Sequence, residues 1–302
     1  MITVKNLRAI AALSDTLHFH RAAERCHISQ PAFSAQIAQL EATLGVALVE
    51  RNHRRVLLTA TGREVAERAK RILRDIGDLA DIARHGARPL SGTLRLGVLP
   101  TLGSYLLPHI LPELRRGYPD LRLYLREEPS SRAIQELQRG DLDLALVSLP
   151  AEGEGLASLP LFDEPFWVAL PLDHPLAQRS EMAVADLKGE RLLLLEDGHC
   201  MRDQVLSVCQ RAGAAEHSDF RATSLDSLRQ MVATGLGGTL LPALYVAEEA
   251  MDDDQIAVRP FAEPPPHRRV GLVWRRTSAR AAEFGLFAEL LRFNLPDVVS
   301  LL

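Results

Sequence analysis

Apolar positions recur at helical spacing in three short stretches near the start of the chain, at residues 4–12, residues 19–25 and from Ser29 onward. The third stretch begins at a good N-cap residue, has Pro31 in its first turn and repeats an apolar side chain every three or four positions. The repeated side chains are Phe33, Ile37, Leu40 and Leu44. Three short helices with tight connections predict a helix-turn-helix, a motif that reads DNA.

The third helix and the segment after it carry the side chains expected to meet DNA. Gln30 and Ser34 lie one turn apart beside the apolar stripe, next to Ser29 and Pro31 at the N-terminal end, from which polar side chains reach base edges. Two short apolar runs then flank a basic tip and predict a β-wing whose cations contact phosphates. These cations are Arg51, Arg54 and Arg55. The alternative is a solvated basic loop on a generic helical bundle.

Residues 59–88 change character and predict one long helix. Thr61 and Glu64 have the spacing of a capping box at its start. The apolar positions that follow are alternately four and three apart over about three heptads. They are Val65, Ala69, Ile72, Ile76, Leu79 and Ala83. This seam predicts pairing with the same helix of another subunit, and the alternative is a surface helix packed on its own domain.

From Gly92 onward, strand patterns alternate with helical patterns, which predicts an α/β fold with parallel sheets and helices on both faces. The predicted strands are residues 93–98, 121–127, 142–148, 166–170, 191–196, 238–243 and 269–274. The predicted helices are residues 103–117, 130–139, 202–212 and 225–235. Proline-containing breaks at 162–165 and 263–266 bracket a middle segment, so two lobes around a cleft are expected.

The expected domains follow from these patterns. A winged helix-turn-helix DNA-binding domain occupies residues 1–58, and a linker helix that mediates dimerisation occupies 59–90. The two-lobed domain occupies residues 91–302. Its lobe I comprises about 91–163 and 267–302, and its lobe II about 164–266.

Polar side chains follow several predicted strands, where ligands bind in sheets of this kind. Thr101 follows the first strand, Ser130 and Ser131 follow the second, and His199 with Cys200 follows the fifth. For Ser130 and Ser131, a role as helix N-cap is an equally open alternative.

Cys200 and Cys209 are nine residues apart in a stretch that is predicted to be largely helical. In a helix, that spacing puts the sulfurs on opposite faces and roughly 13 Å apart along the axis. A disulfide tolerates a Cα separation of only about 7 Å. The pair therefore consists either of inert thiols that pack as small hydrophobes or of a switch that needs the helix to unwind.

Composition and charge narrow the class of protein. The 302 residues contain three cysteines, no apolar run long enough for a bilayer and no secretory signal pattern, which favours a soluble cytoplasmic protein with no membrane association. Residues 1–91 carry 14 Lys/Arg against 9 Asp/Glu, net +5, and the remaining residues carry 21 against 30, net −9. A basic head on an acidic body indicates that the head meets an anionic partner such as DNA.

Other chemistry receives little support. His18, His20 and His27 have no Cys or acidic partner that would complete a zinc site, and Cys26 is expected to pack in the helical head. The chain has no nucleotide-binding loop or catalytic triad, so we expect no catalytic or metal site, no cofactor and no enzymatic activity.

Residues 17–59, which include HFHRAAERCHISQPAFSAQ, resemble the LysR-type transcriptional regulators, and the layout of the whole chain is similar to theirs. The resemblance implies a winged helix-turn-helix, a linker helix and a two-lobed effector domain like a periplasmic binding protein. The segment LEDGHCMRDQVLSVCQRAG is most similar to members of this family that sense hydrogen peroxide.

What the peroxide-sensing members imply is specific. Cys200 would be the peroxidatic thiol, and Cys209 would resolve it to an intramolecular disulfide that switches control of antioxidant genes. The peroxide pocket would comprise Thr101, Ser130, His199, Asp203, Arg268 and Arg269, with Ser130 standing where a threonine is usual. The alternative within the family is a regulator whose interlobe cleft binds a small organic effector.

The resemblance also implies partners. These are double-stranded promoter DNA, RNA polymerase, hydrogen peroxide as the signal, and further copies of the chain. A homotetramer built as a dimer of dimers is expected, because both the linker helix and the effector lobes can self-associate.

Overall fold

The computed structural model describes the chain except residues 53–54 and 86–87, and it describes only the backbone of 51, 52, 55, 78 and 80–85. The chain forms two compact units, Met1–Ala87 and Arg88–Leu302.

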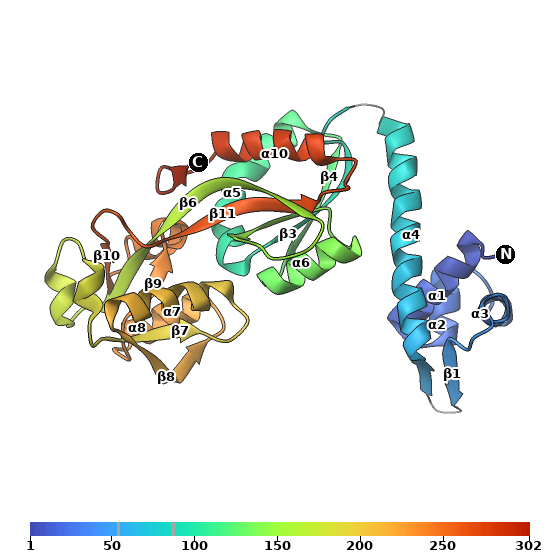
Figure 1. Ribbon diagram of the computed structural model, residues 1–302, viewed down its shortest axis with the longest axis horizontal. Coiled ribbons are helices and arrows are strands. Elements are labelled where there is room, and N and C mark those ends of the chain that lie inside the picture. The colour runs from blue at the N-terminus through green and yellow to red at the C-terminus, as the bar shows by residue number, and fades with distance from the viewer. Residues whose placement is uncertain (53–54, 86–87) are drawn as a thin grey trace. The chain divides into compact units, whose positions relative to one another are not determined.

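The first unit contains three helices, a hairpin and a long helix (Figure 1). They are α1 (Val4–Thr16), α2 (Phe19–Arg25), α3 (Gln30–Leu44), β1 (Val49–Asn52), β2 (Arg55–Leu58) and α4 (Ala60–His85). Strands β1 and β2 pair antiparallel, from Val49 opposite Leu58 to Asn52 opposite Arg55. The predicted helices and wing are confirmed, although α1 extends past residue 12. The predicted apolar side chains Phe33, Ile37 and Leu40 of α3 fill the core together with Ile10 and Leu13 of α1.

Helix α4 begins one residue after Thr59, whose hydroxyl accepts a hydrogen bond from the Gly62 amide at 2.9 Å. The predicted capping box of Thr61 and Glu64 is therefore wrong, because Thr61 already lies inside the first turn. Ala66 and Ala69 are buried in the core of this unit. Farther along, Ile72 and Leu79 are 41% and 65% exposed. The first turns of α4 thus pack on their own domain, and the later turns leave apolar side chains uncovered.

The second unit is built on an eight-stranded mixed sheet in the order β10-β6-β11-β5-β3-β4, with β9 and β12 also paired to β6. Its strands are β3 (Gly92–Val98), β4 (Leu121–Glu127), β5 (Leu144–Leu149), β6 (Leu156–Pro171), β9 (Thr239–Pro242), β10 (Ile256–Pro260), β11 (His267–Arg275) and β12 (Ser300–Leu301). The β3–β4 and β3–β5 pairs are parallel, whereas β11 runs antiparallel to both β5 and β6. The prediction of parallel sheets holds for β3, β4 and β5. It does not hold for β11, which runs antiparallel to β5 and β6.

A separate parallel pair, β7 (Arg191–Leu195) and β8 (Ala215–Ala222), forms a small sheet. Helices surround the two sheets (Figure 1). They are α5 (Pro100–Gly117), α6 (Ser130–Arg139), α7 (Cys200–Ala212), α8 (Leu225–Ala233), α9 (Ala243–Tyr245) and α10 (Ala281–Phe293), with a π-helical turn at Val246–Ala250. Strand β8 escaped prediction because its residues are largely exposed and polar, and so have no apolar run.

Two apolar cores divide this unit into lobes, which we call the first lobe and the second lobe. The first surrounds β3, β5, α5 and α10, and the second surrounds β7, α7 and α8. Strand β6 supplies Phe162 to the first core and Phe166 to the second. Residues 162–165 are therefore continuous strand and not the predicted break, and β6 and β11 both cross between the lobes (Figure 1).

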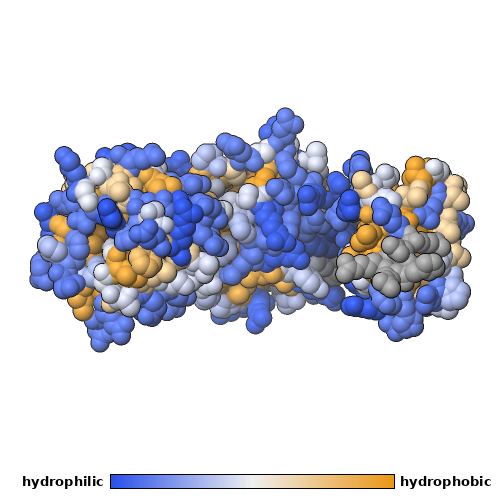
Figure 2. All heavy atoms as spheres, turned by 90° about the horizontal axis from the view of Figure 1, so that it is seen from below, coloured by the Kyte–Doolittle hydropathy of each residue, from blue (hydrophilic) through white to orange (hydrophobic). Residues whose placement is uncertain are grey.

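The face drawn in Figure 2 is covered mainly by hydrophilic side chains, with apolar side chains in small separate patches. Within the described part of the chain, no helix combines the length and apolar composition needed to cross a bilayer.

Candidate functional site

Cys200 is the first residue of α7, and the turn that leads into it is tight. Gly198 has a φ of +98°, a conformation that side chains with a Cβ rarely adopt. His199 occupies the N-cap position but makes no side-chain capping bond. The helix was expected from residue 202 and instead begins at the cysteine itself, so its positive end favours an anion at the sulfur.

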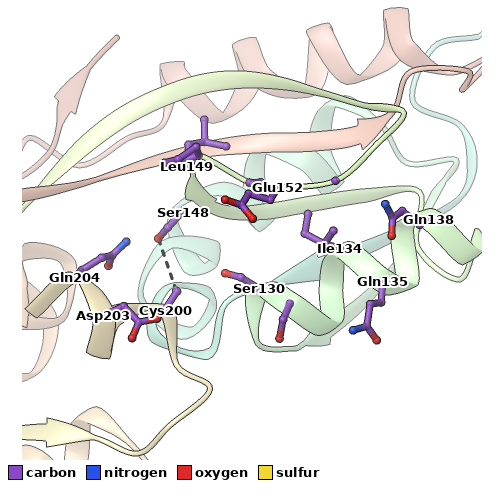
Figure 3. A pocket seen from close by; sticks show the side chains of 14 residues that line it. Ser130, Ile134, Gln135, Gln138, Ser148, Leu149, Glu152, Cys200, Asp203 and Gln204 are labelled. Atoms are coloured by element: carbon purple, nitrogen blue, oxygen red, sulfur yellow. Dashed lines mark hydrogen bonds between the residues drawn. The ribbon is translucent and has the colours of Figure 1, made fainter. Parts of the chain in front are cut away.

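The Cys200 thiol faces the first lobe, although α7 belongs to the second. Its Sγ donates to the hydroxyl oxygen of Ser148, which lies 3.9 Å away near the end of β5 (Figure 3). The half-buried cysteine also packs against the first core. Cys200 is thus a contact between the two lobes.

A cavity of about 650 Å³ lies beside Cys200. Ser130, Ser131, Ser148, Asp203 and Gln204 are among its lining residues. The Ser130 hydroxyl is buried, has no hydrogen-bond partner among the described residues and points toward the side of the cavity where Cys200 lies (Figure 3). The N-cap of α6 is Pro129, so the N-cap alternative for Ser130 is wrong. The buried Oε1 of Gln204 also lacks a partner. Two unsatisfied polar atoms at one cavity suit a small polar ligand.

Cys209 lies in a different environment on the same helix. It is 2% exposed inside the second core, and burial raises the pKa of its thiol. Both Cys200 and Cys209 are free thiols. Because α7 is a regular helix over both positions, the thiols are separated by roughly 13 Å along its axis. A disulfide between them is incompatible with this conformation.

Arg202 lies two residues after Cys200 and pairs with carboxylates. Its guanidinium is buried and donates to Glu216 at 2.8 and 2.9 Å and to Asp197 at 2.9 Å. The hydrogen bond from Arg202 holds the pKa of the Glu216 carboxyl below its usual value. The arginine therefore fastens the start of α7 to β8. Asp203, by contrast, is exposed and lines the cavity.

Thr101 and Arg268 meet in a network of their own. Arg268 is 1% exposed and donates from Nη1 to the Thr101 hydroxyl and from Nη2 to the Thr101 carbonyl, both at 2.8 Å. Its Nε donates to Glu164 at 2.7 Å, and the other Glu164 oxygen accepts from the Leu244 amide at 3.0 Å. The network joins α5, both crossing strands and α9.

The structure thus gathers only part of the predicted pocket. Cys200, Ser130 and Asp203 share the cavity, whose described lining includes none of Thr101, His199, Arg268 and Arg269. Arg269 is half exposed and makes two hydrogen bonds to Asp163, at 2.8 and 2.9 Å, which lower the pKa of that carboxyl.

Three residues of this region escaped sequence reasoning. Ser148 lies at the end of a predicted strand, and Gln204 lies one helical turn after Cys200, so both positions had a local signal. Glu164 had none, because its partner Arg268 is 104 positions away.

In the first unit, the N-terminal end of α3 is accessible. Gln30 and Pro31 are exposed and Ser34 is half-buried. Ser29 is the N-cap residue, as predicted, but its side chain makes no capping bond. The predicted DNA contacts of the wing are not tested, since Arg54 and the side chains of Arg51 and Arg55 lie outside the described residues.

Two histidines of this unit make local contacts. His18 accepts a hydrogen bond from the Arg21 amide at 3.5 Å, and His20 lies 3.3 Å from the Glu24 carboxylate. Among the described residues, no three His, Cys, Asp or Glu side chains gather in a way that would hold a metal ion.

Comparison with known proteins covers both units. The family model "Bacterial regulatory helix-turn-helix protein, lysR family" matches residues 4–63, and "LysR substrate binding domain" matches residues 87–295. The chain is 44% identical to the DNA-binding transcriptional dual regulator OxyR of Escherichia coli over 97% of its length and 96% of that protein.

Solved structures agree with the sequence comparison. Full-length OxyR from Pseudomonas aeruginosa matches with a TM-score of 0.78 and 36% identity over 100% of this chain and 98% of that one. A mutant OxyR of Corynebacterium glutamicum with hydrogen peroxide bound matches with a TM-score of 0.68 and 35% identity, over 97% and 92% of the two chains.

Proposed function

The chain belongs to the LysR family of bacterial transcriptional regulators, and we propose that it is a DNA-binding regulator controlled by hydrogen peroxide. One observation carries this proposal. Cys200 sits at a helix N-terminus beside a cavity in which the buried Ser130 hydroxyl has no partner. A peroxide molecule would satisfy that hydroxyl while its oxygen lies next to the sulfur.

The first chemical step uses the Cys200 thiolate. The sulfur attacks one peroxide oxygen, the O–O bond breaks, and the products are a sulfenic acid and hydroxide, which takes up a proton to become water. The N-terminal end of α7 stabilises the thiolate, and Ser130 orients the peroxide. Asp203 lines the cavity and is placed to bind the peroxide from the exposed side.

The second step brings in Cys209. Its thiol attacks the sulfenic sulfur, a disulfide forms, and the sulfenic oxygen leaves as water. Both thiols lie on α7, but Cys200 packs against the first core and Cys209 lies inside the second. For the disulfide to form, α7 therefore has to unwind and Cys209 has to leave the second core. The disulfide exists in only one of the two conformations, so oxidation shifts the population between them.

The DNA-binding part of the proposal rests on the first unit. The exposed N-terminal end of α3 enters the major groove through Gln30 and Ser34, and the basic wing contacts phosphates. The uncovered apolar side chains of α4 pair with a second copy, and the effector lobes complete a tetramer built as a dimer of dimers. The altered arrangement of subunits changes contact with promoter DNA and with RNA polymerase.

The proposal includes the cellular compartment in which the switch acts and the way in which it is reset. The protein acts in the cytoplasm, where cellular thiols return the disulfide to its reduced form. It is a regulator and not an enzyme, since one oxidation per reduction cycle carries the signal.

A second candidate within the family is a regulator of small organic effectors. It is favoured by the volume of the cavity, about 650 Å³, which is within the range that holds metabolite-sized ligands. In that case Cys200 and Cys209 would have no role in sensing.

Treatment of the purified reduced protein with a slight excess of hydrogen peroxide separates the candidates. A peptide map should show one disulfide, between Cys200 and Cys209, and a free Cys26. Cys200→Ser should keep its DNA affinity and lose the peroxide-dependent change in the DNA footprint, whereas Cys26→Ser should respond like the parent. Free Cys200 and Cys209 after peroxide treatment would reject the proposal.

A further inference from the structure

Ser148 is a buried hydroxyl that none of the steps above uses. It lies near the end of β5 in the first lobe and is 7% exposed. The hydrogen bond that the structure gives its side chain is the one from Cys200 Sγ, at 3.9 Å. A buried hydroxyl with a thiol as its partner is directed at the reacting atom of the sensor.

We propose that Ser148 is a further catalytic group of this site, whose hydroxyl stabilises the Cys200 thiolate that attacks peroxide. The proposal rests on the peroxide-sensing function and adds a named group to it. In this proposal, Ser148 hydrogen-bonds to the sulfur, and Ser130 hydrogen-bonds to the peroxide oxygens.

The chemistry of a hydroxyl allows this role without any movement of the backbone. In the thiol form, the S–H donates to the serine oxygen, as the structure has it. When the thiol loses its proton, the same hydroxyl rotates about its C–O bond and donates to the sulfur anion. Hydrogen bonds to charged groups are stronger and shorter than those between neutral groups, so the 3.9 Å contact tightens in the reactive form.

The positions of the two serines separate their roles. Ser148 comes from β5 and Ser130 from the start of α6, so they approach the Cys200 region from two different elements (Figure 3). Ser148 already has the sulfur as its partner, whereas the Ser130 hydroxyl has none and is open to the peroxide. The lining residue Ser131 is exposed and serves as a matched control.

The pH dependence of Cys200 alkylation tests the proposal directly. Reduced full-length protein is treated with iodoacetamide over a range of pH, and the modified peptide is quantified by mass spectrometry. Ser148→Ala should raise the apparent pKa of Cys200 and lower its thiolate fraction at neutral pH about three- to tenfold. The rate constant for oxidation by peroxide should fall in parallel.

Two further variants complete the test. Ser148→Thr, which keeps a hydroxyl, should restore part of both effects, and Ser131→Ala should change neither. An unchanged apparent pKa in Ser148→Ala would overturn the role of Ser148, even if oxidation slowed, because the residue would then act through packing alone. Alkylation needs no peroxide, so this result stands apart from the disulfide map, whose failure would reject the sensing function itself.

Discussion

Arg268 and Glu164 form an ion pair, with 2.7 Å between Nε and Oε2, in which neither side chain has any exposed surface. The two residues face each other on β11 and β6, the strands that cross between the lobes. Through Thr101 on one side and the Leu244 amide on the other, the pair ties elements of both lobes to these strands. It holds the two crossing strands together between the lobes.

Removing one partner of this pair should destabilise the second unit strongly. Glu164→Gln or Arg268→Met leaves a buried charge uncompensated, which costs about 3–5 kcal/mol. Urea unfolding of the full-length protein, followed by circular dichroism, measures the loss. Asp163→Asn is the matched control, because it removes the charge from the neighbouring, partly exposed pair with Arg269 and should cost far less. Equal losses for both variants would contradict the structural role of the buried pair.

Acid should loosen the start of α7 through Glu216. In the folded state, the hydrogen bond from Arg202 holds the pKa of Glu216 below its ordinary value of 4.5. The ionised carboxylate therefore stabilises the fold, and this contribution is fully present above pH 4.5. That contribution is lost as the pH falls below 4.5 through the lower folded pKa. Unfolding free energies measured on either side of this window should fall with pH more steeply in the parent than in Glu216→Gln. The same slope in both proteins would show that Glu216 does not contribute.

The later turns of α4 should form an interface with the same helix of a second copy of the chain. On α4, Leu79 is 65% exposed and Ile72 is 41% exposed. An aspartate in the seam would bury a charge in the interface, so Leu79→Asp should lower the molar mass in sedimentation velocity. Leu172→Asp, at a leucine 52% exposed in the second lobe, is the control and should leave the mass unchanged. Equal masses for Leu79→Asp and the parent would exclude this helix as an interface.

Gln30 should contribute to DNA sequence selection. A bidentate side chain that reads a base edge discriminates by about 1–3 kcal/mol, so Gln30→Ala should reduce the preference for a selected site over random duplex about tenfold or more. Fluorescence anisotropy with a site recovered by selection from random DNA measures both affinities. Gln39 is exposed on the same helix nine positions later, on the opposite face, so Gln39→Ala should behave like the parent. If both variants lose specificity equally, α3 does not read DNA through Gln30.

Much of the first unit was predictable because its signals are local. The apolar repeat of α3 follows from side-chain spacing alone, and the short runs that flank the basic tip pair as a hairpin. The spacing of Cys200 and Cys209 likewise predicted that a disulfide needs the helix to unwind, and the helix is present over both positions.

The second unit departed from prediction where contacts are distant in the chain. Residues 162–165 look like a break because they contain acidic and proline residues, yet β11 pairs along them and keeps them in strand conformation. Arg202 lies two residues after Cys200 in the chain, yet its guanidinium turns to Glu216 and Asp197. An ion pair forms with whichever partner the fold brings within reach, and adjacency in the chain does not decide it.

By itself, the sequence determined the order of helices and strands in the head, the long linker helix and the conflict between a helix and a disulfide, because each depends on periodicity over a few turns. The tertiary structure alone decided that Cys200 meets Ser148, 52 positions away, and that Arg268 meets Glu164, 104 positions away. These contacts depend on strand register and on which lobe each helix face packs against. Local patterns of polar and apolar residues do not encode either of these.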